Sequence, residues 1–161
     1  PSWSRVQSAL PDLLNEIRDD LRTLPSVKRV YEGVPDAINE FPAVIVAAMG
    51  ARCWLSSHGR NGIAPLHCQH DIRVEIHIPR KDLEKDAATM EEVAVGVAIT
   101  LYAGFATDRY NGTMVTTGNP QTSNNATAPL TYTIGPSQWA GQQTYAMMAD
   151  FAVTTSREVT V

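Results

Sequence analysis

The stretch HCQHDIRVEIHI, residues 67–78, alternates apolar and polar side chains along its length. Successive side chains of a β-strand point to opposite faces of the sheet, so this alternation predicts a strand with two unlike faces. The apolar face is expected to pack on the core, and the polar face is expected to be exposed. The predicted core face carries Cys68, His70, Ile72, Val74, Ile76 and Ile78, and the predicted polar face carries His67, Gln69, Asp71, Arg73, Glu75 and His77.

A helix is predicted directly after this strand, over residues 82–102. Asp82 suits the N-cap position, because an aspartate side chain accepts a hydrogen bond from the free backbone N–H groups of the first turn. Apolar residues recur behind it at helical spacing, which predicts one buried stripe. The members of this stripe are Leu83, Met90, Val93, Val97 and Leu101.

A second amphipathic helix is predicted over residues 3–24, where apolar side chains recur at steps of three and four. Pro11 falls inside this pattern, and a proline in a helix interior removes one backbone hydrogen bond at a cost of about 3 kcal/mol. We therefore expect a kink at Pro11, or a fresh helix start with Pro11 in its first turn. Pro25 is expected to end the helix.

Shorter strands are predicted between the two helices. Residues 27–31 are expected to form one, and the apolar run AVIVAAM, residues 43–49, is expected to form another that is buried on both faces and ends at Gly50. Loops are expected over residues 33–42 and, after a possible short strand at residues 53–55, up to residue 66.

The last third of the chain predicts three more strands, over residues 113–117, 129–134 and 144–155. The polar segments GNPQTSNNATAP, residues 118–129, and GPSQWAGQQ, residues 135–143, are expected to be loops between them. This order of elements predicts a single α+β domain, with a mixed or antiparallel sheet packed by two main helices.

The composition, 43% hydrophobic and 19% charged with a net charge of −4, is that of a globular protein. This charge gives no general attraction to nucleic acid or to an anionic membrane. We expect neither a membrane span nor a signal peptide, and therefore a soluble protein made in a cytoplasm. Cys53 and Cys68 can pair if their strands are neighbours, although a reducing cytoplasm disfavours a disulfide.

Residue types for several chemical sites are present, but their placement argues against each site. Four histidines and two cysteines could supply zinc ligands, yet strand alternation divides those of residues 67–78 between two faces. Asp71 and Glu75 flank Arg73, as in an exposed and mutually neutralised charge row. The sequence has no G-x-S-x-G motif and no glycine-rich phosphate loop. We therefore expect no enzyme, no catalytic or metal-binding residue and no cofactor.

The runs VKRVYEGVPDAINEFPAVIVAAM, residues 27–49, and HIPRKDLEKDAATMEEVAVGVAITLY, residues 77–102, together resemble the tail terminator proteins of long-tailed bacteriophages. The likeness lies in the pair Val30-Tyr31, the Pro-x-x-Ile-Asn-x-Phe-Pro loop of residues 35–42, and a strand that ends in Pro-Arg-Lys-Asp-Leu at residues 79–83. The resemblance covers roughly residues 25–102, about half of the chain.

The resemblance implies a structural virion protein with an α+β fold. Such subunits assemble into a ring, usually a hexamer, on the head-proximal end of the tail tube. The ring ends tube polymerisation and offers a surface to the head-completion or connector protein, and DNA only passes through its channel. Another neck or minor tail component stays open as an alternative, and a small non-viral enzyme or ligand-binding domain is a third.

If a ring forms, we expect its contacts in the loop of residues 36–40 and at the strand-to-helix corner. Large aromatic residues outside the core are frequent interface anchors. We therefore also count Trp54 and Trp139, both expected in loops, among the candidate contacts. Charge reversal at Arg80 is expected to weaken assembly with little change in monomer stability. The candidate assembly contacts are Asp36, Asn39, Glu40, Trp54, Arg80, Lys81, Asp82 and Trp139.

Overall fold

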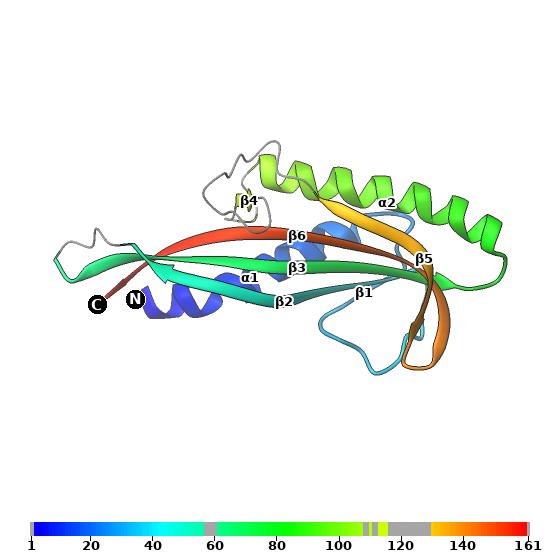
Figure 1. Ribbon diagram of the computed structural model, residues 1–161, viewed down its shortest axis with the longest axis horizontal. Helices are drawn as coiled ribbons and strands as arrows, with labels where there is room; N and C mark the ends of the chain where they lie inside the picture. The colour runs from blue at the N-terminus through cyan, green and yellow to red at the C-terminus, as the bar shows by residue number, and fades with distance from the viewer. Residues whose placement is uncertain (1, 57–60, 108–109, 111–112, 116–129, 161) are drawn as a thin grey trace.

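A computed structural model describes residues 2–56, 61–107, 110, 113–115 and 130–160, with the backbone alone for residues 2–9 and 113–115. It has two layers, a mixed sheet and a pair of helices packed on one face of that sheet (Figure 1). The predicted α+β class is therefore confirmed. The elements are α1 (Ser2–Arg22), β1 (Arg29–Tyr31), β2 (Ala43–Leu55), β3 (Ile63–Pro79), α2 (Leu83–Ala106), β4 (Thr113–Val115), β5 (Thr131–Trp139) and β6 (Gln142–Thr160).

The sheet is built around two long antiparallel strands, β3 and β6. They pair without interruption from Ile63 opposite Thr160 to Pro79 opposite Thr144. On the other side of β3 lies β2, which is antiparallel to β3 and parallel to the short β1. On the other side of β6 lie β5, along residues 142–150, and β4, along residues 152–154. The described strand order is thus β1-β2-β3-β6-β4, with β5 also paired to β6.

The main core lies between the sheet and the two helices, and we call this side of the sheet the helix face. The apolar side chains predicted for the core side of β3, namely Ile72, Val74, Ile76 and Ile78, are buried there. The predicted stripe of α2 is also buried, with one exception. Leu83, the first residue of the helix, is 53% exposed. The helix begins after Asp82 as predicted, but ends at Ala106 rather than near residue 102.

By length and composition alone, α2 would qualify as a membrane-crossing helix, which is weak evidence by itself, and the expectation of no membrane span stays a prediction. The core helix of a soluble protein passes the same test. In this fold one side of α2 packs on the sheet, with Met90, Val97 and Leu101 fully buried.

α1 runs continuously through Pro11, so the helix does not start afresh there, and a kink at Pro11 stays a prediction. Pro11 is exposed, whereas Leu13, Ile17 and Leu21 are buried in the main core. The burial of this stripe outweighs the one backbone hydrogen bond that proline cannot make.

The opposite side of the sheet, which we call the second face, is covered at one end. Tyr31, Ile38, Ala43 and Ile45 form a small core there, against which Phe41 and Trp139 pack. The loop of residues 32–42 therefore folds over the sheet. Its contact with the β5–β6 hairpin is fixed by Gln142, whose side chain accepts a hydrogen bond from the Ile38 backbone N–H (3.0 Å) and donates one to the Ile38 carbonyl (3.1 Å).

His77, predicted to lie on an exposed polar face, is fully buried under this cover. Its Nδ1 lies 2.8 Å from the Thr144 hydroxyl, and its ring meets the edge of Trp139 at 5.5 Å between centroids. The prediction was wrong because the covering hairpin lies more than 50 residues further along the chain.

The prediction that residues 135–143 form a loop was also wrong. It continues β5, turns at Ala140 and Gly141, and enters β6. Both turn residues have positive φ angles, 48° and 83°, as a two-residue hairpin turn requires. The other predicted polar loop, residues 118–129, lies outside the described residues.

At the end of the molecule away from this hairpin, three strands run on past α2 (Figure 1). We call this extension the arm; it comprises residues 48–55 of β2, 63–71 of β3 and 153–160 of β6. The prediction that Gly50 ends β2 was wrong. A register shift between Ala48 and Gly50 instead marks a bulge, after which the strand continues to Leu55.

Candidate assembly surface

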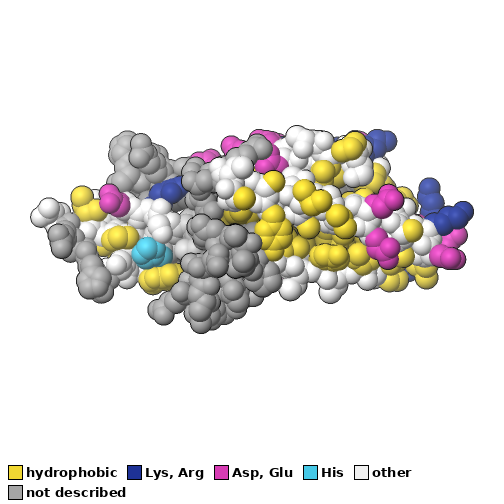
Figure 2. All heavy atoms as spheres, turned by 90° about the horizontal axis from the view of Figure 1, so that it is seen from above, with side chains coloured by type: hydrophobic (Ala, Val, Ile, Leu, Met, Phe, Trp, Pro, Cys, Tyr) yellow, Lys and Arg dark blue, Asp and Glu magenta, His cyan; other side chains and the backbone are white. Residues whose placement is uncertain are grey.

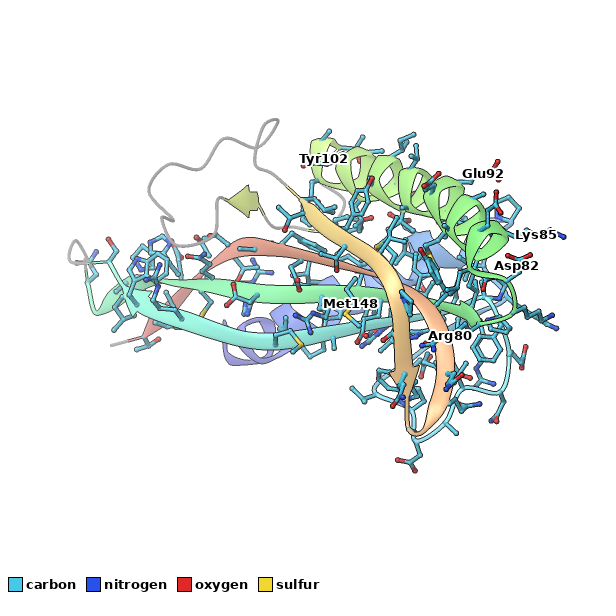
Figure 3. All side chains as sticks on the ribbon, turned by 45° about the vertical axis from the view of Figure 1, so that its right-hand side comes forward. Arg80, Asp82, Lys85, Glu92, Tyr102 and Met148 are labelled. Atoms are coloured by element: carbon cyan, nitrogen blue, oxygen red, sulfur yellow. A yellow bond between two sulfur atoms is a disulfide. The ribbon has the colours of Figure 1, made fainter. Side chains whose placement is uncertain are left out.

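At the strand-to-helix corner, residues 80–82, most polar groups make hydrogen bonds within the chain (Figure 3). The Arg80 guanidinium donates to the carbonyl of Ser137 (2.7 Å) and to that of Thr144 (3.2 Å), which ties the corner to the β5–β6 hairpin. Asp82 caps α2 as predicted, because its Oδ1 accepts from the Glu84 N–H at 3.1 Å. The side chain of Lys81 is exposed, and its backbone N–H donates to Asp86 at 3.0 Å.

We therefore expect Arg80→Ala to lower the free energy of unfolding by about 1–2 kcal/mol, because two partly buried carbonyl groups lose a charged donor. This replaces the expectation that changes at Arg80 leave monomer stability unaltered. Lys81→Ala is the matched control and should change the free energy of unfolding by less than about 0.5 kcal/mol, as an exposed substitution. Urea unfolding of both variants measures the difference; equal stabilities would place Arg80 among the free surface groups.

The three candidate contacts in the loop of residues 36–40 differ in exposure and in their contacts within the chain. Asp36 and Asn39 are exposed, and the Asn39 backbone N–H donates to the Tyr31 hydroxyl at 3.1 Å. Glu40 is half-buried and lies 3.4 Å from the Arg29 guanidinium. The carboxylate of Asp36 and the amide of Asn39 are thus presented to solvent on a loop whose backbone is fixed.

The two candidate tryptophans were expected in loops, but both lie on strands. Trp139 ends β5, is half-buried, and donates its indole N–H to the Pro35 carbonyl at 3.0 Å. Its role in holding the loop of residues 32–42 is intramolecular. Trp54, near the end of β2, is 36% exposed on the arm.

Trp54 is the centre of a small cluster on the second face of the arm. Its ring stacks on His67 at 5.6 Å, and the Arg52 guanidinium lies 5.9 Å from its centroid. Arg52 also donates to the Gln69 side chain at 3.1 Å, and His67 lies 2.7 Å from the Ser156 hydroxyl. These contacts hold the indole in one orientation while leaving part of it open to a partner.

The arm carries surface that sequence reasoning missed. Every residue of β2 from Ala48 to Leu55 is exposed, whereas the four residues that begin the strand are buried. Met49 is 57% exposed, Leu55 50% and Ile63 44%. The available signal was the possible short strand predicted at residues 53–55, which is the end of β2 and not a separate element.

Cys53 and Cys68 lie directly opposite each other in the arm and form a disulfide, with their Cα atoms 4.1 Å apart. The expectation that a reducing cytoplasm keeps them apart was wrong for this structure. The condition attached to it, that the two strands be neighbours, is met. The bond joins β2 to β3 near the far end of the arm.

The three histidines that the structure describes, His67, His70 and His77, form no common site. Among the described residues, no three His, Cys, Asp or Glu side chains are placed to hold a metal ion. His70 is buried on the helix face beside the Thr155 hydroxyl at 3.2 Å, and burial lowers its pKa below the usual value, although Asp71 opposes this shift. His70 is therefore neutral near pH 7.

A shallow hollow of about 150 Å³ lies on the second face, beside Met148 (Figure 3). It is smaller than the roughly 300–1,000 Å³ typical of small-molecule sites. Backbone and small side chains form most of its wall, and no histidine or carboxylate lines it. The lining residues are Thr133, Ile134, Gly135, Pro136, Ser137, Ala146 and Met148.

A second apolar surface lies on the outer side of α2. Figure 2 looks down on it and shows hydrophobic side chains gathered there with carboxylates beside them. Val95 and Ile99, one helical turn apart, are exposed, as are Glu91 and Glu92. None of the candidate assembly contacts predicted from the sequence lies on this outer side of α2.

Comparison with known proteins adds no family assignment: no protein-family model and no curated protein sequence matches this chain.

Proposed function

We propose that this protein is a ring-forming tail terminator of a long-tailed bacteriophage. A ring of its copies, six by the family resemblance, would cap the head-proximal end of the tail tube. The ring would end tube polymerisation and present a surface to the head-completion or connector protein. This role is structural, requires no cofactor and places the protein in the virion.

One observation carries the proposal beyond the sequence resemblance. The arm projects past α2 with eight consecutive exposed residues in β2, including Met49, Trp54 and Leu55. A monomer gains nothing from displaying such a strand, and natural proteins usually cover or blunt exposed strand edges. Cyclic assembly is a common way to cover them.

The direct test combines mass photometry of the purified chain with a tube-capping assay. We expect a ring-sized particle, or a monomer that becomes a ring on contact with tube ends, and electron microscopy should locate it at one end of each tube. Added before tube growth ends, the protein should shorten the tubes. A chain that stays monomeric and binds no tube end would contradict the proposal.

A pull-down separates the terminator from its alternative. Immobilised chain should retain purified tail tube protein as well as the connector side of the neck. Retention of connector proteins alone would identify another neck component instead.

A further inference from the structure

We propose that neighbouring copies of this chain join through their arms, with the free edge of β2 in one copy pairing in parallel with the free edge of β6 in the next. The inference rests on the proposed ring and identifies the surface that closes it. Within the described part of the chain, β1 pairs β2 only at residues 43–45, and the outer side of β6 is unpaired beyond residue 154.

The free edge of β2 has its peptide groups directed outward at alternate residues. The Cα atoms of Cys53 and Cys68 are 4.1 Å apart, the spacing of a non-hydrogen-bonded pair in an antiparallel ladder. The N–H and C=O of Cys53 therefore point away from β3, and so do those of Ala51 and Leu55. The alternate set turns inward, as the Ser56 N–H shows by donating to the Pro65 carbonyl at 2.9 Å.

The same alternation shows which residues of β6 direct their peptide groups away from β3; we call these the outward set of β6. Cys68 turns its peptide groups away from β2 and toward β6, where it lies opposite Thr155. The peptide groups of Thr155 therefore face β3, and Ser156 and Glu158, one and three residues further on, direct their N–H and C=O groups outward. As far as the structure describes the chain, both edges of the arm thus offer backbone donors and acceptors that pair with no other strand.

The two edges also match in position and direction. Trp54, His67 and Ser156 lie in one row across the arm, so both edges are free at the same level. β2 and β6 are each antiparallel to β3 and hence parallel to each other. Copies related by rotation about an axis along the arm keep this direction, so β6 of one copy meets β2 of the next in parallel. Repetition of this head-to-tail contact closes into a barrel with three strands from each copy.

The side chains favour this pairing over a two-fold one. Arg52 is the only charged residue of β2, and Glu158 belongs to the outward set of β6. Their partners in β3, Gln69 and Pro65, are an even number of residues apart, so Arg52 and Glu158 lie on the same face of the sheet. The two β3 partners lie four residues apart (69 − 65 = 4), so Arg52 comes beside Glu158 only if β6 and the next β2 pair with a stagger of four residues, of the kind that strand tilt produces in a barrel. In that register opposite charges meet, whereas antiparallel pairing of β2 with a second β2 about Arg52 brings two arginines together.

Charge reversal tests the junction in the full chain. Arg52→Glu and Glu158→Arg should each weaken ring formation by about fivefold or more per contact, and the double variant should recover most of the loss, because only the order of the charges is exchanged. Mass photometry over a concentration series gives the association, and thermal melting shows whether each monomer is still folded.

A backbone substitution tests strand pairing independently of charge. Ala51→Pro removes an outward N–H that has no strand partner among the described residues, and should abolish the ring while the monomer stays folded. Ala51→Val keeps this N–H and is the matched control. Should Ala51→Pro not fold, Ser156→Pro with Ser156→Val makes the same comparison on β6.

The outcomes separate this inference from the proposed function. Rings that form normally from Ala51→Pro, or single charge reversals without effect, would overturn the arm junction and leave the terminator role intact. A wild-type particle of two copies would overturn it in favour of two-fold pairing. Wild-type chain that neither self-associates nor binds tube ends would overturn the function itself.

Discussion

Replacing Gly104 by alanine should lower the free energy of unfolding by about 2–3 kcal/mol, although alanine is the better helix former. Gly104 is buried in the last turn of α2, and a Cβ added there would overlap the ring of Tyr110. That ring cannot move aside freely. Its hydroxyl donates to Asp20 at 2.6 Å, and the ring packs against Phe105 at 4.7 Å between centroids. Overpacking therefore outweighs the gain in helix propensity.

The matched control is Gly96→Ala, in the middle of the same helix. A Cβ at Gly96 would meet only a Leu24 methyl group at 3.8 Å, which is an ordinary contact. This variant should be more stable than the wild type by about 0.5–1 kcal/mol. Chemical unfolding of both variants measures the contrast. A stabilised Gly104→Ala would mean that Tyr110 does not pack against this turn.

Reduction of the disulfide should destabilise the chain by up to about 3 kcal/mol, the loop-closure entropy expected for two cysteines 15 residues apart. The effect should appear as a lower melting temperature in the presence of a thiol reductant. Because the bond lies in the arm, the arm should also lose protection of its amide hydrogens before the helices do.

The control for reduction is the double variant Cys53→Ser with Cys68→Ser. It should melt at the same temperature with and without reductant, and close to the reduced wild type. If reductant lowers the melting of this variant equally, the effect on the wild type is not due to the disulfide.

Local pattern was sufficient to predict much of the fold. The alternation around Ile72 and Val74 predicted β3 and its core side, and Asp82 predicted the start of α2. Where local signals and distant packing disagreed, packing prevailed. Pro11 did not interrupt α1, because burial of the neighbouring stripe holds the helix together. Gly50 did not end β2, because β3 offers a pairing partner beyond it.

The candidate surface was harder to predict, because exposure depends on residues that are distant in sequence. His77 looked like part of a polar face, but Trp139 and the loop of residues 32–42 cover it. Arg80 looked like a free charge, but its two acceptors lie on a hairpin more than 55 residues away. The exposed half of β2 was predicted only as a possible short strand at residues 53–55, because side chains that are exposed along the whole stretch show little apolar periodicity.

The pairing of β3 with β6 also sets the order in which the protein can mature. Residues between 65 and 97 positions apart must meet before this ladder exists, and such long-range pairing is slow compared with helix formation. Until β6 arrives, β3 itself is an unpaired edge. A chain caught at that stage presents the wrong strand to its neighbours, so the last strand to join the sheet decides when a copy becomes competent for correct assembly.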